Sequence, residues 1–208
     1  MKSLFFRMMF VLFVMTSLYV QAQSDKDPIK RRLIVNAGTS LFYFRYQSEW
    51  SKGFLPVEAS VDYGIHKYVS VGVGAGFQRR DFFFLDSRHY TPTRRFNYSL
   101  FYRSFTLRTS LHLSGFFNDM LNIHINENKL DIYTVYMAGV TQNERKHYFQ
   151  HSAAEPVDFS GYRSSEDIAY ILGITTGIRY YPVKPIGIFT EVGAGSLSMV
   201  KFGITAKF

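Results

Sequence analysis

The stretch VSVGVGAGF, residues 69–77, alternates apolar residues with small or polar ones without a break. Valine, alanine and phenylalanine share one face of this stretch, and serine and glycine share the other. Successive side chains of a β-strand point to opposite faces, so a period of two predicts a two-faced strand and not a helix. Glycines on the second face leave room for large side chains from neighbouring strands.

The same alternation returns in seven further segments, which predicts an all-β chain. The eight predicted strands span residues 33–45, 54–65, 68–80, 97–113, 130–143, 167–181, 186–195 and 197–208. Connections alternate between short turns and longer loops, with long loops expected at 81–95 and 144–166. A short amphipathic helix is expected in SGFFNDMLNIHINENK, between the fourth and fifth strands. An even number of strands places both chain termini on the same side of the membrane.

One face of every predicted strand is apolar, whereas the other carries charges of both signs. The charged set is Glu58, Asp62, Arg80, Arg108, Asp131, Arg179, Glu191 and Lys201. Water would not accept so many apolar outer faces, and an Arg or Lys facing mid-membrane lipid costs about 2–4 kcal/mol. The sequence therefore predicts an eight-stranded antiparallel up-and-down transmembrane β-barrel, with its charges paired in a narrow lumen. The alternative is a soluble, lipocalin-like barrel, which would need an apolar interior.

The first residues have the features of a secretory signal. Lys2 and Arg7 precede an apolar run over 8–20, and Ala22 ends a signal-peptidase pattern. We expect cleavage after Ala22, which leaves a barrel domain over 23–208; the alternative is an uncleaved anchor. The 208-residue chain has no cysteine, so neither disulfides nor cysteine metal sites are available. A mean hydropathy near zero excludes a bundle of membrane helices.

The last eight residues, KFGITAKF (201–208), resemble the C-terminal assembly signal of bacterial outer-membrane proteins. Lys201, Gly203 and Phe208 match that signal, whereas Ala206 is a weak match to its penultimate hydrophobic place. The resemblance implies recognition by the barrel assembly machinery. We expect Phe208 to lie on the lipid face, and the last strand to close onto the first, because a membrane does not accept exposed sheet edges.

Further stretches, such as PVEASVDYGIHKYVSVGVGAGF and GIRYYPVKPIGIFTEVGAG, resemble the small outer membrane beta-barrel protein family. These are porin-like relatives of the eight-stranded OmpX and OmpA barrels of Gram-negative bacteria. The resemblance covers nearly all of the chain after the signal, and implies the barrel fold and the outer membrane. It implies no defined activity and no catalytic residues.

The predicted outer loops suggest surface contacts. Arg79, Arg88, Arg94 and Arg95 cluster near the second outer loop, where they would meet lipopolysaccharide phosphates. The alternative is a solvated rim paired with nearby aspartates. The run FFFL (82–85) either extends its strand above the membrane, offering an edge to a partner, or belongs to a lipid-facing girdle, which we favour. Nucleic acid is not an expected partner of an exported chain, despite the formal net charge of +8.

Catalytic groups are present in the loops without a defining spacing. His89 lies with Asp86 and Ser87 in one loop, and His147, His151 and Ser152 lie in another. We interpret them as ordinary polar residues, and expect no catalysis, cofactor or metal; His112 is expected to pack inside the barrel. The sequence favours a structural, adhesive or surface-binding role. The alternatives are a small channel or a lipid-modifying enzyme.

Overall fold

The computed structural model describes residues 28–42, 51–53, 55–86, 94–150, 163–195, 197 and 199–208. The predicted signal peptide and its cleavage site lie outside the described residues. The strands are β1 (Leu33–Phe42), β2 (Ser51–Gly53), β3 (Val57–His66), β4 (Val69–Asp86), β5 (Arg94–His112), β6 (Leu130–Gln150), β7 (Arg163–Val183), β8 (Ile186–Ala194) and β9 (Val200–Lys207). The helix α2 (Leu113–Leu121) joins β5 to β6.

All strand pairs are antiparallel, and apart from the short β2 each strand pairs with the strands that precede and follow it in the chain. The short strand β2 continues β3, because both pair along β4, so the barrel has eight strands. Pairing of β1 with β9, from Ile34 opposite Lys207 to Phe42 opposite Val200, closes the sheet. The expected eight-stranded antiparallel up-and-down barrel is therefore confirmed.

Burial alternates along the strands as the sequence predicts. In β8, Gly187, Phe189 and Glu191 are buried, whereas the residues between them are exposed. Polar and charged residues outnumber hydrophobic ones among the described buried residues, and large apolar side chains cover the outside. A soluble barrel with an apolar interior is therefore wrong for this chain.

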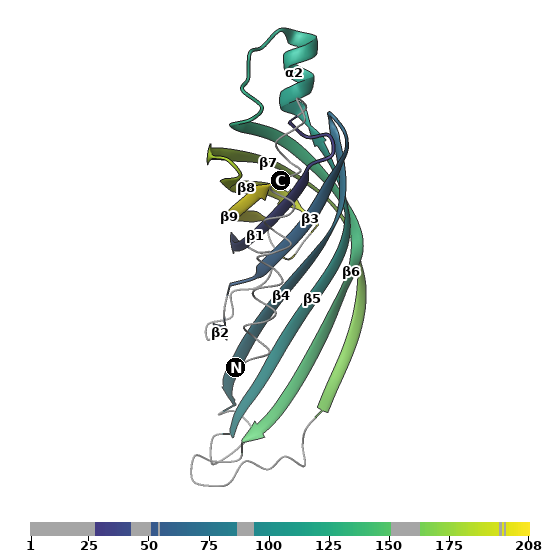
Figure 1. Ribbon diagram of the computed structural model, residues 1–208. Helices are drawn as coiled ribbons and strands as arrows, with labels where there is room; N and C mark the ends of the chain where they lie inside the picture. Colours follow the sequence, from purple (N-terminus) through teal and green to yellow (C-terminus); the bar gives the residue numbers. More distant parts are fainter. Residues whose placement is uncertain are drawn as a thin grey trace, which may run out of the picture.

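The strands β4–β7 are longer than expected, with 18, 19, 21 and 21 residues. Much of the two stretches predicted as loops, 81–95 and 144–166, is strand: Asp86 pairs with Arg94, and His147 pairs with Arg163. These strand ends carry polar and aromatic residues on both faces, so the sequence shows no period of two there. Figure 1 shows these strands reaching far beyond β8 and β9, on the side away from α2.

The two ends of the barrel therefore differ. The end that carries α2 and the turns at 67–68 and 184–185 is called the turn end below; the opposite end is the loop end. The helix predicted between the fourth and fifth strands is present as α2, with Ser114 and Gly115 buried. Asn122 ends it in a left-handed conformation (φ 54°).

Candidate functional site

The barrel lumen holds a network of ion pairs centred on Glu191 of β8, which is 1% exposed. Its Oε1 accepts hydrogen bonds from Arg108 Nη2 at 3.0 Å and from the Tyr133 hydroxyl at 2.9 Å. Its Oε2 lies 3.1 Å from Lys201 Nζ, and Lys201 also reaches Glu58 at 3.1 Å. Each oxygen of this buried carboxylate is therefore met by a cation, which a charge in a low-dielectric interior requires.

A second cluster lies around Arg179, which is fully buried. Its Nη1 is 2.9 Å from Asp131 Oδ2, and its Nη2 is 3.6 Å from Asp62 Oδ2. The guanidinium carbon lies 3.5 Å from the ring centroid of Tyr133, a cation–π contact. Asp62 also faces Arg108 Nε at 3.4 Å, so the two clusters form one network across the lumen.

Glycine makes the room for this network. A Cβ on Gly177 would lie 2.8 Å from the ring and hydroxyl of Tyr133, and one on Gly72 would lie 2.3 Å from Asp62 Oδ1. These positions account for the small residues on the lumen face of the strands.

Ser70, His112 and Asp131 are hydrogen-bonded to one another in the sequence seen in a catalytic triad, an arrangement that the amino-acid sequence did not predict. His112 Nε2 is 3.0 Å from Ser70 Oγ, and His112 Nδ1 is 2.9 Å from Asp131 Oδ1. However, Ser70 is 0% exposed and His112 is 1% exposed. No substrate could reach this hydroxyl, so the arrangement serves packing and links Ser70 to the ionic network through Asp131.

Arg80 is also buried, at 7% exposure, nearer the loop end. With the Gln78 amide oxygen turned toward it, Arg80 donates from Nε and Nη2 at 2.7 and 3.1 Å. All eight residues of the predicted lumen set therefore point inward, and seven of them belong to the connected network; Arg80 has separate contacts.

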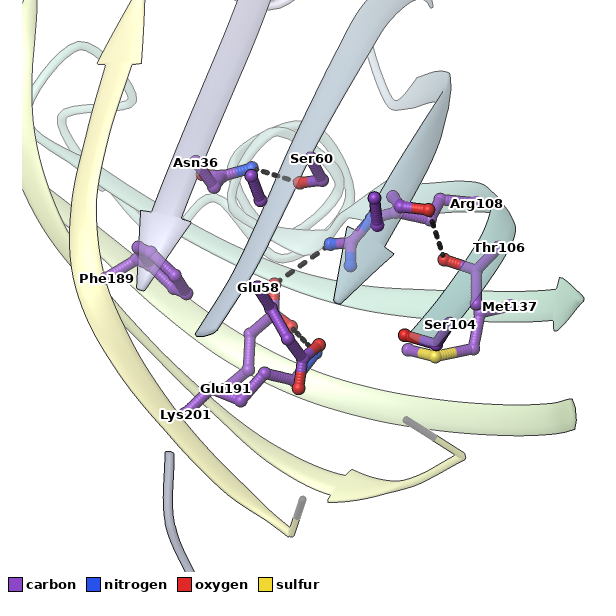
Figure 2. A pocket seen from close by; sticks show the side chains of 13 residues that line it. Asn36, Glu58, Ser60, Ser104, Thr106, Arg108, Met137, Phe189, Glu191 and Lys201 are labelled. Carbon is purple, nitrogen blue, oxygen red and sulfur yellow. Dashed lines mark hydrogen bonds and ion pairs between the residues drawn. The ribbon is translucent and has the colours of Figure 1, made fainter. Parts of the chain in front are cut away.

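The space left among the described lumen side chains is small. A cavity of about 20 Å³ lies among these side chains and is lined by Asn36, Arg108, Met137, Glu191 and Lys201, among others (Figure 2). A single water needs roughly 10–15 Å³ measured in this way. The cavity holds about one water and is too small for a continuous aqueous path through this section of the lumen.

Toward the loop end, β4, β5 and β6 carry charges of both signs, of which Arg79, Asp81 and Arg103 are well exposed and Glu144 is largely covered. Arg79 pairs with Asp81 at 3.0 Å, and Glu144 lies 3.4 Å from Arg103 and 2.9 Å from Lys146. Arg79 and Lys146 both approach the Phe101 ring, at 5.3 and 5.0 Å from its centroid. We call these six residues the outer belt; in it, the described cations face acidic partners.

The other arginines predicted to contact lipopolysaccharide are placed only in part. Arg94 and Arg95 belong to β5 at the loop end, with side chains outside the described set, and Arg88 lies outside the described residues.

The polar loop residues considered as possible catalytic groups are also placed only in part. His147 belongs to β6 and Asp86 to β4, whereas Ser87, His89, His151 and Ser152 lie outside the described residues.

Within the described part of the chain, no group of three or more His, Asp or Glu side chains could hold a metal ion. None of the described helices is long and apolar enough to cross a membrane.

The C-terminal residues occupy the closing strand. Lys201 points into the lumen, and Gly203 lies opposite Gly38, where the strands approach closely. Phe208 is only 9% exposed, so the expectation of an open, lipid-facing side chain is wrong. The strand ends at Lys207, and alternation no longer sets the direction of the following side chain; the Phe208 backbone still pairs with Leu33.

At the turn end, the helix α2 is fixed to the β3–β4 turn. Asp119 accepts hydrogen bonds from Lys67 and from the Tyr68 hydroxyl. The hydrogen bond with Asp119, more than any other contact, raises the pKa of Lys67, and the hydrogen bonds from Lys67 and then Tyr68 lower the pKa of Asp119. Asn118 holds the following loop through Ile125 and Glu127.

Sequence reasoning did not identify Tyr133, Asn36 and Ser70 as members of the lumen network. The alternation predicts that their side chains point inward, but no local pattern shows which side chains meet across a barrel. His112 was expected to pack inside, and its partners appeared only in three dimensions.

No protein-family model matches the chain, and no curated protein sequence matches it. Among solved structures, the chain is similar to the N-terminal β-barrel domain of Pseudomonas aeruginosa OprF (TM-score 0.44, 11% identity, 86% of this chain and 98% of that one). It is also similar to Ail, the attachment invasion locus protein of Yersinia pestis (TM-score 0.44, 15% identity, 86% and 100%). A structure of Ail with the heparin analogue sucrose octasulfate gives TM-score 0.43 and 16% identity over 85% and 96%.

Proposed function

We propose that the protein is an integral outer-membrane barrel that binds extended polypeptide at the cell surface through a protruding sheet. The observation that carries this proposal is the difference in strand length. A membrane-spanning strand needs about 9–11 residues, which matches the 10 residues of β1 and β3 and the 9 of β8. The strands β4–β7 have about twice that length, so half of each would stand beyond the membrane.

The outward side chains support this placement. Val73, Leu107 and Ile188 are exposed apolar residues on the part of the barrel where all eight strands pair. The outer belt follows them toward the loop end on β4, β5 and β6. Charged residues facing outward are costly in lipid, so the belt would mark the outer boundary of the membrane.

The protruding sheet has a free edge along β7. The last pair between β7 and β8 joins Ile174 to Ala194, and no described strand pairs with that side of residues 163–171. Tyr181 N–H donates to Lys129 C=O, so odd-numbered residues of β7 bond to β6 through this unbroken register. Even-numbered residues, including Glu166, Ile168 and Tyr170, therefore direct their backbone groups toward the free edge.

Such an edge can take up one more strand. Unpaired N–H and C=O groups template an incoming extended chain, and side chains beside them supply specificity. Ile168 and Tyr170 are 72% and 89% exposed at this edge, which gives the incoming strand apolar contacts. We name residues 163–171 the β7 edge.

The proposed role of the β7 edge is tested by removing one backbone N–H donor from it. Ile168→Pro removes an edge-facing N–H without touching the bonds to β6, and proline is tolerated at sheet edges. Ile168→Ala removes the same side chain but keeps the N–H. Whole cells carrying the protein are incubated with fluorescent, unfolded casein as the extended-chain probe. We expect binding by the wild type and Ile168→Ala, and a loss of at least tenfold in Ile168→Pro; equal binding by both variants would overturn the edge mechanism.

A channel is the weaker alternative. Eight-stranded barrels are generally filled by their own side chains. We propose that Glu58, Asp62, Arg108, Asp131, Arg179, Glu191 and Lys201 act as a plug, supported by their ion pairs and by the cavity of about 20 Å³. Arg80 would extend this polar filling toward the loop end.

Biogenesis and lipid contacts are part of the same proposal. Residues 1–22 would direct export, and Lys201, Gly203 and Phe208 would be recognised by the barrel assembly machinery. Arg79, half exposed in the outer belt, would meet lipopolysaccharide phosphates, together with Arg88, Arg94 and Arg95. No catalytic role is proposed.

A further inference from the structure

The turn end of the barrel carries positive charge that the described carboxylates do not balance. Lys30, Arg31, Lys129 and Lys184 are exposed there, and none has an acidic partner within 4 Å among the described residues. In the α2 region, Asp119 is paired with Lys67 and also accepts from the Tyr68 hydroxyl, whereas Glu127 accepts from the neutral Asn118 amide and keeps its charge. We call the four exposed cations the basic rim.

The basic rim is held by three separate chain segments. Arg31 N–H donates to Gly64 C=O at 2.8 Å, which fixes the N-terminal turn against β3. Lys129 C=O accepts from Tyr181 N–H at 2.8 Å, and Pro185 C=O accepts from Lys207 N–H at 2.9 Å. The four cations are therefore distributed around the barrel mouth and do not form one flexible run of basic residues.

Lys207, at the end of β9, also has no carboxylate within 4 Å among the described residues, and its Nζ donates to the backbone carbonyl of Glu127 at 3.2 Å. The outer belt is different, because Arg79, Arg103 and Lys146 each face a carboxylate within 4 Å. The three cations of the outer belt are therefore paired, whereas the four cations of the basic rim have no carboxylate within 4 Å among the described residues.

We propose that the basic rim binds the phosphate groups of anionic phospholipids in the leaflet at the turn end. This inference rests on the proposed membrane placement, which puts the rim at the level of the lipid headgroups. Each Lys or Arg near an anionic membrane surface adds attraction that falls off within a Debye length. Phosphatidylcholine also has a phosphate but no net charge, so a preference for phosphatidylglycerol isolates the charge effect.

The experiment uses the full chain after signal removal, refolded into vesicles of equal parts phosphatidylglycerol and phosphatidylcholine. Mass spectrometry of the extracted protein gives the ratio of the two lipids retained. We expect several-fold enrichment of phosphatidylglycerol at low salt, reduced at 0.5 M salt. The variant Lys30→Gln/Arg31→Gln/Lys129→Gln/Lys184→Gln should lose most of this enrichment and bring the ratio of the two lipids close to one.

The matched control is Met120→Ser, a change at the same end that is 67% exposed and alters no charge. It should keep the wild-type lipid ratio. A ratio of one in the wild type, or a ratio unchanged in the fourfold variant, would overturn the basic rim as a lipid site. The same protein is also run on an SDS gel, boiled and unboiled. Equal migration of the two samples would count against the membrane barrel itself, so the two failures are distinguishable.

Discussion

Arg179 and Asp131 face each other across the barrel interior, with Nη1 and Oδ2 2.9 Å apart and both side chains almost wholly excluded from solvent. Removing one partner of such a pair leaves a buried charge without compensation, which costs about 3–5 kcal/mol. We expect Arg179→Met to lower the free energy of unfolding by that amount. The measurement is a urea titration in which the folded fraction is read from the band that the unboiled protein gives on an SDS gel. Arg79→Gln, at an exposed pair, should cost less than about 1 kcal/mol. Equal effects would contradict the network.

The close approach of Gly177 to Tyr133 predicts that a larger residue at position 177 destabilises the barrel. A Cβ at Gly177 would approach the Tyr133 ring to 2.8 Å, so Gly177→Ala should cost about 1–3 kcal/mol by overpacking. The same urea titration measures it. Thr176→Ala, on the neighbouring outward position, is the control and should change stability by less than about 1 kcal/mol. A stable Gly177→Ala variant would mean that the lumen packs more loosely than described.

The filled lumen predicts the absence of a steady current. With a cavity of about 20 Å³ among paired charges, purified protein in a planar bilayer should give no persistent conductance steps. A porin of about 16 strands, which has an aqueous channel, is the positive control under the same salt and voltage. Reproducible steps from this chain would favour the channel alternative.

Orientation is testable because the chain has no native cysteine. Ser165→Cys places a thiol on the exposed β7 edge, and Met120→Cys places one on α2 at the opposite end. A membrane-impermeant maleimide should label the first variant in intact cells, and both variants after osmotic lysis. Labelling of the α2 position in intact cells would invert the proposed topology.

Substitutions of the final residue, Phe208, can test its role in assembly separately from its role in stability. Phe208→Leu keeps most of the buried volume, so its stability after refolding in vitro should change by less than about 1.5 kcal/mol. If the machinery requires a terminal aromatic residue, the amount assembled in cells should fall several-fold in Phe208→Leu and remain normal in Phe208→Tyr. Unchanged assembly of Phe208→Leu would show that the aromatic ring is not recognised.

Strand identity and the inward or outward direction of side chains could be predicted because each depends on a period of two. The alternation in 69–77 placed Val71 and Val73 outside, and the charge at Glu191 had to face inward. The same logic failed where the alternation is lost. The ends of β4–β7 carry polar and aromatic residues on both faces, and were predicted as loops.

The sequence by itself determined the barrel class, its eight strands and the set of lumen charges, since these follow from local alternation and the cost of charge in lipid. Only the tertiary structure decided that Glu191 meets Arg108, Tyr133 and Lys201, and that His112 lies between Ser70 and Asp131. Contacts across a lumen depend on the register of all eight strands together, and no single segment encodes that register. The free β7 edge likewise arises from where β8 ends relative to β7.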